Sequence, residues 1–127
     1  MALKRVFISF AMEDENLRNL LVGQSKNSNS PFEFADYSVK QLWDNAWKTN
    51  CRTRIKGCNG VIAILTNNTR NAYGQLWEIK CAREEGIPIL YIRGNTGSDF
   101  LYLPQELINI QPMSWTWDNI TSWISRL

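Results

Sequence analysis

One apolar segment, Val61 to Leu65, constrains the fold of this chain more than any other part of the sequence. It contains no polar residue, follows Gly60 and is followed by the polar cluster Thr66 to Asn71. A surface helix or a half-exposed strand would interrupt such a run with polar positions, whereas a strand that is covered on both faces needs none. We therefore expect Val61 to Leu65 to lie at the centre of a parallel sheet with helices on both faces.

Three further segments are predicted strands: Val6 to Phe10, Phe32 to Ala35 and Ile87 to Ile92. The first is also almost continuously apolar and suits a central position, whereas the second alternates in polarity and suits a place nearer a sheet edge. Leu107 to Ile110 supplies a fifth strand, a short edge element that ends at Pro112.

Helical patterns fill the intervals between these strands. Acids at the start of the first helix complement the helix dipole, and a Ser-x-x-Gln capping box begins the second. The first predicted helix covers Glu13 to Gln24, and the second runs from Ser38 to an end that lies between Cys51 and Lys56. The third ends at Gly86, and Thr116 or Asp118 caps the last. Strands that alternate with helices predict a flavodoxin-like α/β three-layer sandwich, with about five parallel strands in the order 2-1-3-4-5. Residues 1–127 are too few for two ordinary cores, so we expect one domain.

The composition argues against several classes of function. Histidine is absent, which removes Ser-His-Asp and Cys-His catalysis and histidine-based metal sites. The formal charge of +2 is too small for the basic stripe that phosphate neutralisation needs, so no nucleic-acid partner is expected. The usual glycine motifs for phosphate binding are also missing, which argues against a P-loop enzyme or a Rossmann dehydrogenase.

Three cysteines, Cys51, Cys58 and Cys81, form an odd set without a C-x-x-C pair. We therefore expect buried free thiols rather than disulfides or zinc ligands. The apolar residues near Lys4 and Arg5 indicate a strand and not a signal peptide, and no apolar run is long enough to span a bilayer. These features predict a soluble protein of the reducing cytoplasm, without a membrane partner.

Ligands of open parallel sheets bind beyond the carboxyl ends of the strands, where the strand order reverses. That point falls between the first and third predicted strands. Phe10 and Ala11 lie at the end of the first strand, and Asp36 and Ser38 follow the second, so these four are candidate substrate-binding residues. Ser38 is also the expected helix cap. A magnesium-dependent phosphorylation receiver would need clustered acids here, but no acid directly follows the third strand.

Several charged residues are open to two interpretations. Asp14 either borders the ligand site or only complements the dipole of the helix that it begins. Arg52, Arg54 and Lys56 either contact a pyrophosphate, whose oxygens suit an arginine fork, or remain solvated surface charges.

Five segments in a fixed order carry the most specific signal in the sequence. They are Val6-Phe7-Ile8-Ser9-Phe10, Asp36-x-Ser38, Arg54-Ile55-Lys56-Gly57-Cys58-Asn59-Gly60 leading into the central strand, Trp77-Glu78-Ile79, and Gly86-Ile87-Pro88-Ile89. This organisation resembles the TIR-like family, and in particular the short stand-alone proteins of bacterial Thoeris anti-phage systems. The resemblance runs from about Lys4 to Ile92. The serine that often precedes the glutamate in catalytic members has no counterpart at Ala72 or Tyr73.

The resemblance implies an enzyme. Catalytic members of the family cleave the nicotinamide-ribose bond of NAD, and the Thoeris members are held to make a cyclic ADP-ribose isomer that activates an effector protein. By this resemblance Glu78 is the catalytic carboxylate and NAD is the substrate, with no other cofactor and no metal. Self-assembly, a phage protein as trigger and the signal-activated effector are the implied partners.

The implied reaction can proceed with a single carboxylate. Ordinary glycosidases use a second acid to protonate a poor leaving group. Nicotinamide attached to ribose is already a cation and leaves as a neutral molecule, so this acid is not needed. One carboxylate can stabilise the oxocarbenium-like sugar that remains.

Glu78 and Trp77 each have a plainer interpretation. Glu78 could be a solvated helix acid that faces Lys80 or Arg83, and Trp77, which could stack on a nicotinamide or adenine ring, could belong to the core. Two other functions stay open. One is a non-catalytic TIR-like assembly module, which exposed tryptophans would favour. The other is a nucleoside deoxyribosyltransferase-like enzyme, in which the carboxylate would be a covalent nucleophile.

Overall fold

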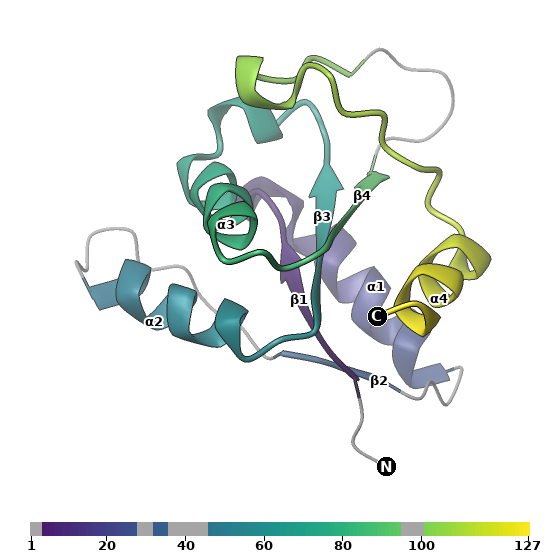
Figure 1. Cartoon of the computed structure of the whole chain (residues 1–127). Helices are drawn as coiled ribbons and strands as arrows, with labels where there is room; N and C mark the ends of the chain where they lie inside the picture. The colour runs from purple at the N-terminus through teal and green to yellow at the C-terminus, as the bar shows by residue number, and fades with distance from the viewer. Residues whose placement is uncertain (1–3, 28–31, 36–45, 95–100) are drawn as a thin grey trace.

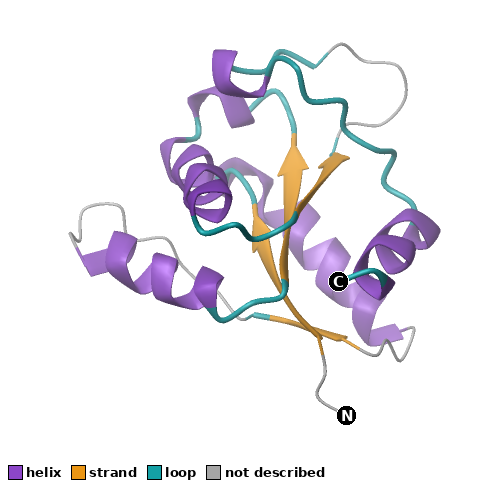
Figure 2. Cartoon of the chain, viewed as in Figure 1, coloured by secondary structure: helices purple, strands orange, loops and turns teal. Residues whose placement is uncertain are grey.

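The fold is a four-stranded parallel sheet with helices on both faces, in a computed structural model that describes residues 4–27, 32–35, 46–94 and 101–127. The strands are β1 (Lys4–Ser9), β2 (Phe32–Phe34), β3 (Gly60–Leu65) and β4 (Ile89–Arg93), in the order β2-β1-β3-β4. The helices are α1 (Glu15–Asn27), α2 (Ala46–Lys56), α3 (Tyr73–Glu84) and α4 (Trp117–Ser125). This arrangement confirms the predicted flavodoxin-like α/β class (Figure 2).

The apolar segment after Gly60 is the centre of the sheet, as its sequence predicts. Strand β3 pairs with β1 on one side and with β4 on the other, and Ile62 lies between Ile8 and Leu90 in this register. All six residues of β3 are buried. Strand β2 pairs only with β1 and lies at the edge, also as predicted.

The helices form two layers around the sheet. Figure 1 shows α2 and α3 on one face and α1 and α4 on the other. The α1 and α4 face encloses the largest apolar cluster, in which Leu21 of α1 and Ile120 of α4 pack against β-strand residues such as Ile62. On the opposite face, Ile55 of α2 and Ala82 of α3 pack in a second cluster. The three-layer prediction is therefore confirmed.

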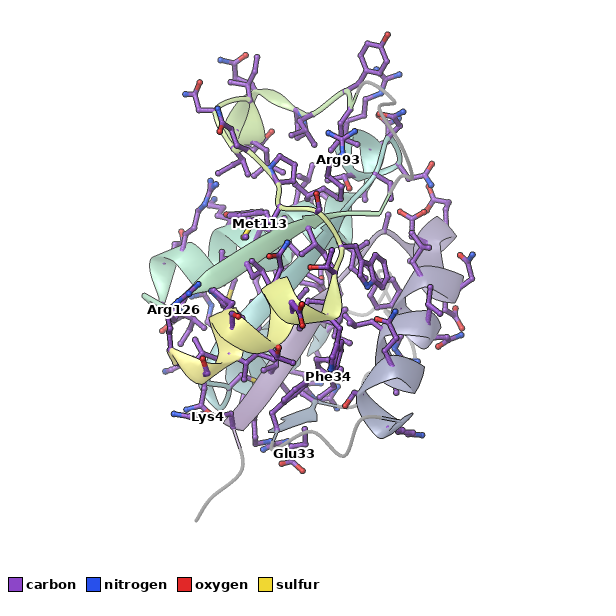
Figure 3. The ribbon with its side chains drawn as sticks, turned by 90° about the vertical axis from the view of Figure 1, so that its right-hand side faces the viewer. Lys4, Glu33, Phe34, Arg93, Met113 and Arg126 are labelled. Atoms are coloured by element: carbon purple, nitrogen blue, oxygen red, sulfur yellow. The ribbon has the colours of Figure 1, made fainter. Side chains whose placement is uncertain are left out.

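The prediction of a fifth strand over Leu107 to Ile110 is wrong. Residues Gln105–Leu107 form a 3₁₀ turn instead, and Leu107 is fully buried against Ile79. The chain reaches the sheet later, where Met113 donates its N–H to the carbonyl of Tyr91 at 2.8 Å. Figure 3 shows Met113 beside β4, whose end is marked by Arg93. A short apolar run is compatible with a buried turn as well as with a strand, which is why the pattern misleads here.

The later helix boundaries follow the sequence signals, whereas α1 is shifted from its predicted bounds: a 3₁₀ turn covers Met12–Asp14, and the helix runs from Glu15 to Asn27. Helix α2 continues through Lys56, which settles the end that the sequence leaves open, whereas the capping box at Ser38 lies outside the described residues. Thr116, and not Asp118, caps α4, because its side-chain oxygen accepts a hydrogen bond from the N–H of Asn119. Gly86 ends the α3 segment with a φ of 70°, a conformation that suits glycine.

The cysteines match their prediction. Cys51, Cys58 and Cys81 are buried free thiols. Within the described ranges, no helix combines the length and apolar character needed to cross a bilayer.

Two glycine substitutions are expected to change stability in opposite directions. At Gly94 an added Cβ would lie 2.7 Å from Cγ2 of Thr66 and 2.9 Å from Cγ2 of Ile64, both of them buried. Gly94→Ala should therefore lower the free energy of unfolding by about 1–3 kcal/mol through overpacking. At Gly23, inside α1, nothing lies within 4 Å of an added Cβ. Gly23→Ala should raise the free energy of unfolding by about 0.5–1 kcal/mol, because alanine costs less backbone entropy in a helix.

Urea unfolding followed by circular dichroism measures both effects. A shift of the same sign in the two variants would contradict this account of where the chain is closely packed.

Candidate functional site

Glu78 lies in the protein interior, at the carboxyl end of the sheet. Helix α3 directs it toward the last residue of β1, where the hydroxyl of Ser9 donates a hydrogen bond to its Oε1 at 2.8 Å. The thiol of Cys51, from α2, lies 3.7 Å from Oε2. Only 2% of Glu78 is exposed. The interpretation of Glu78 as a solvated helix acid is therefore wrong.

A buried glutamine connects this carboxylate to two strands. Gln75 lies one helical turn before Glu78, so the two side chains share a face of α3. Its Nε2 donates to the carbonyl oxygen of Ser9 at 3.1 Å and to that of Ile64 at 2.7 Å. Its Oε1 is buried and has no hydrogen-bond partner among the described residues. The amide of Gln75 thereby fixes α3 against the ends of β1 and β3.

A second carboxylate, that of Asp14, lies after the end of β1 and is also buried. Its Oδ2 accepts a hydrogen bond from the hydroxyl of Thr66, and its Oδ1 accepts one from the amide of Asn68 at 2.9 Å. Thr66 and Asn68 belong to the segment that follows β3. Asp14 therefore links the segment after β1 to the segment after β3. This link is additional to the interaction with the helix dipole that its sequence position suggests.

Of the predicted substrate-binding residues, the structure describes Phe10, Ala11 and Trp77. Phe10 is buried in the cluster that faces α1 and α4, the opposite face of the sheet from Ser9 and Glu78. Ala11, two residues after the end of β1, is also buried. Asp36 and Ser38 lie outside the described residues. A substrate-binding role for Phe10, Ala11, Asp36 and Ser38 stays a prediction.

Trp77 lies next to Glu78 but packs toward α2. Its ring centroid is 5.3 Å from that of Trp47 in an edge-to-face arrangement. The guanidinium of Arg52 lies over the same ring, at 5.6 Å from the centroid. Trp77 is half-buried against the second cluster, which agrees with a core role. Stacking on a substrate ring stays a prediction.

The basic residues of α2 lie away from Glu78. Arg52 forms ion pairs with Glu84 and Glu85, at the carboxyl end of α3, and these hydrogen bonds raise the pKa of Arg52 while Arg52 lowers the pKa of Glu84. Arg54 and Lys56 lie in the last turn of α2, before the start of β3. They therefore lie near the amino end of β3, whereas the ligand site is predicted at the carboxyl ends of the strands. The structure does not bring these two residues to that site.

The remaining chemistry of the site is limited. Burial raises the pKa of the Cys58 and Cys81 thiols, so neither is a ready thiolate nucleophile. No group of three or more metal-ligating side chains occurs in the part of the chain that the structure describes. Glu78 is a buried acid on the face of the sheet that α2 and α3 cover, and it contacts the end of β1.

Ser9, Gln75 and Cys51 were not identified as site residues from the sequence. Ser9 does carry a signal, because it is a polar residue inside an otherwise apolar run. Gln75 precedes Glu78 by three residues, a spacing that places both side chains on one helix face. The approach of Cys51 depends on how α2 packs on α3, which no local pattern gives.

Comparison with known proteins supports the resemblance seen in the sequence. No curated protein sequence matches the chain. Among solved structures, the chain is similar to the TIR domain of the Toll-related receptor TRR-2 from Hydra magnipapillata, with a TM-score of 0.60, 16% identity, and coverage of 95% of this chain and 91% of that chain. It is also similar to a prokaryotic SEFIR domain, with a TM-score of 0.54, 12% identity, and coverage of 97% and 88% respectively.

These structural similarities show the fold alone. The sequence profile of the Thoeris protein ThsB, TIR-like domain, matches residues 7–99, which is more than half of the chain. The matched residues include the second half of β1, all of β3 and α3, and Glu78 at the centre of α3. The chain therefore belongs to the TIR-like domain family of the Thoeris protein ThsB.

Proposed function

We propose that this chain is an NAD-cleaving enzyme of anti-phage defence, in which Glu78 is the catalytic carboxylate. It releases nicotinamide from NAD and makes a cyclic ADP-ribose-type signal that activates an effector protein. The observation that supports this proposal most directly is the buried carboxylate of Glu78, held by Ser9 at the carboxyl end of β1. This is the edge at which open parallel sheets bind their ligands.

The surroundings of Glu78 suit an electrostatic role. A carboxylate in a site of low dielectric constant stabilises a nearby cation far more than a solvated one does. The ribosyl cation that forms as nicotinamide departs is such a species. Water or an internal nucleophile of the ADP-ribose then captures it, and cyclisation requires that water be excluded.

Two observations bear on the alternatives. None of the tryptophans in the described ranges is among the exposed large hydrophobic residues, so the feature that would favour an assembly module is missing there. Both oxygens of Glu78 have a potential donor, Ser9 at Oε1 and Cys51 at Oε2. Hydrogen-bond donors on both oxygens reduce the nucleophilicity of the Glu78 carboxylate. This disfavours the covalent deoxyribosyltransferase-like mechanism and leaves an electrostatic role intact.

The burial of Glu78 also bears on activation. With 2% of its surface exposed, the residue is covered in this conformation, so NAD reaches it only after neighbouring residues move. We therefore propose a resting state that requires a trigger. A phage protein or self-assembly would supply the trigger.

The proposal is tested with purified protein and NAD, with and without phage lysate. Mass spectrometry follows nicotinamide release and the linear and cyclic products. We expect nicotinamide and a cyclic product in the presence of lysate. Glu78→Gln protein under the same conditions identifies any release that comes from the lysate itself. Equal release by both proteins would refute the mechanism, and cleavage of deoxynucleosides in place of NAD would favour the deoxyribosyltransferase-like alternative.

A further inference from the structure

We infer that Ser9 is a positioning residue that fixes the orientation of the Glu78 carboxylate. The inference rests on the proposed function, because positioning has a catalytic consequence only if Glu78 acts on substrate. Its structural basis is the 2.8 Å hydrogen bond from the Ser9 hydroxyl to Oε1 of Glu78, between two residues that are both buried.

Ser9 is itself firmly held. It is the last residue of β1 and pairs with Ala63 of the central strand. Its carbonyl oxygen accepts a hydrogen bond from Gln75, and none of its surface is exposed. The position of its hydroxyl therefore follows from the sheet and does not depend on a mobile loop.

Glu78 needs such support because its last torsion is intrinsically broad. The hydrogen bond from Ser9 to Oε1 favours one rotation of the carboxylate, in which Oε2 lies toward Cys51. The Ser9 hydroxyl also lies 3.5 Å from the carbonyl oxygen of Gln75, a longer contact than the one to Glu78. Without this hydroxyl, the carboxylate keeps its charge but loses the shorter of the two contacts, from Ser9 and from Cys51, that orient it.

The expected consequence is a loss in turnover rather than in substrate affinity. Orientation matters most where charge develops, in the transition state, so kcat should fall while KM stays nearly constant. Ser9→Ala should lower kcat for nicotinamide release by roughly 10- to 100-fold, the range that a small misplacement of a catalytic group produces. Ser9→Thr retains the hydroxyl and should recover most of this loss. Ser122→Ala, the same change at an exposed position, should leave kcat unchanged.

A second measurement tests the contact without using activity. In a double-mutant cycle, urea unfolding midpoints are compared for Ser9→Ala, Glu78→Met and the double variant. Methionine has about the length of glutamate but accepts no strong hydrogen bond. The change in the urea midpoint caused by Ser9→Ala should therefore be at least twofold smaller in the Glu78→Met background than in wild type.

The outcomes separate this inference from the proposed function. If wild-type protein releases nicotinamide and Ser9→Ala keeps the wild-type kcat, or Ser9→Thr is as slow as Ser9→Ala, the positioning role is refuted while NAD cleavage stands. If wild-type protein is inactive with every trigger, the proposed function fails, and the cycle still decides whether the two side chains are coupled. Additive unfolding shifts would refute the coupling.

Discussion

Glu78→Gln is expected to lower nicotinamide release by about 100- to 1,000-fold, the scale on which loss of one preorganised electrostatic group slows an enzyme. Glutamine has nearly the same size and retains an oxygen that can accept the hydrogen bond from Ser9. The substitution therefore removes the charge and little else. Steady-state release of nicotinamide under triggered conditions measures the effect.

The matched control for this prediction is Glu84→Gln. Glu84 lies on the same helix, but its side chain is 49% exposed and pairs with Arg52 at the surface. Exposed ion pairs contribute little to stability, so this variant should have wild-type activity and an unfolding midpoint close to that of wild type. Equal losses of activity in the two variants would show that the buried position of Glu78 has no special role.

Ile62→Ala is expected to lower the free energy of unfolding by about 2–5 kcal/mol, which is a large part of the total stability of an ordinary domain. Ile62 is fully buried at the centre of the sheet, between Ile8 and Leu90, and belongs to the largest apolar cluster. Truncation to alanine leaves a cavity that the neighbouring strands cannot fill. Urea unfolding followed by tryptophan fluorescence measures the loss.

Ile108→Ala makes the same chemical change at a residue that is 61% exposed. We expect its free energy of unfolding to remain within about 0.5 kcal/mol of wild type, as for most surface substitutions. Comparable destabilisation by the two variants would mean that β3 is not the centre of the core.

The sequence predicted the elements whose signals are local. The unbroken apolar run of β3, between Gly60 and a polar cluster, favours a fully covered strand. Thr116 starts α4 through its side-chain cap, and Gly86 ends the α3 segment through its backbone conformation. The segment after Pro104 was predicted wrongly, because Leu107 is buried by a 3₁₀ turn that packs against Ile79, a contact between distant parts of the chain. Apolar character alone does not distinguish this kind of burial from a strand.

The candidate site was only partly predictable for the same reason. Glu78 was identified through the resemblance of the chain to a family, and only the structure shows its contact with the end of β1. Ser9 and Gln75 are 66 residues apart, and their hydrogen bond depends on the register of β1 and on the direction of α3. No periodicity within one segment contains that information.

The hydrogen bond between Ser9 and Glu78 spans 69 positions of the chain. Parallel strands cannot pair through a tight hairpin, so β1 and β3 meet only after a crossover has closed, and such distant pairings form slowly. A nascent chain that has emerged only as far as β3 holds Ser9 but still lacks its carboxylate partner. Under the proposed function, NAD consumption therefore begins only when the sheet and α3 have come together, and incompletely folded molecules leave the dinucleotide pool of the cell untouched.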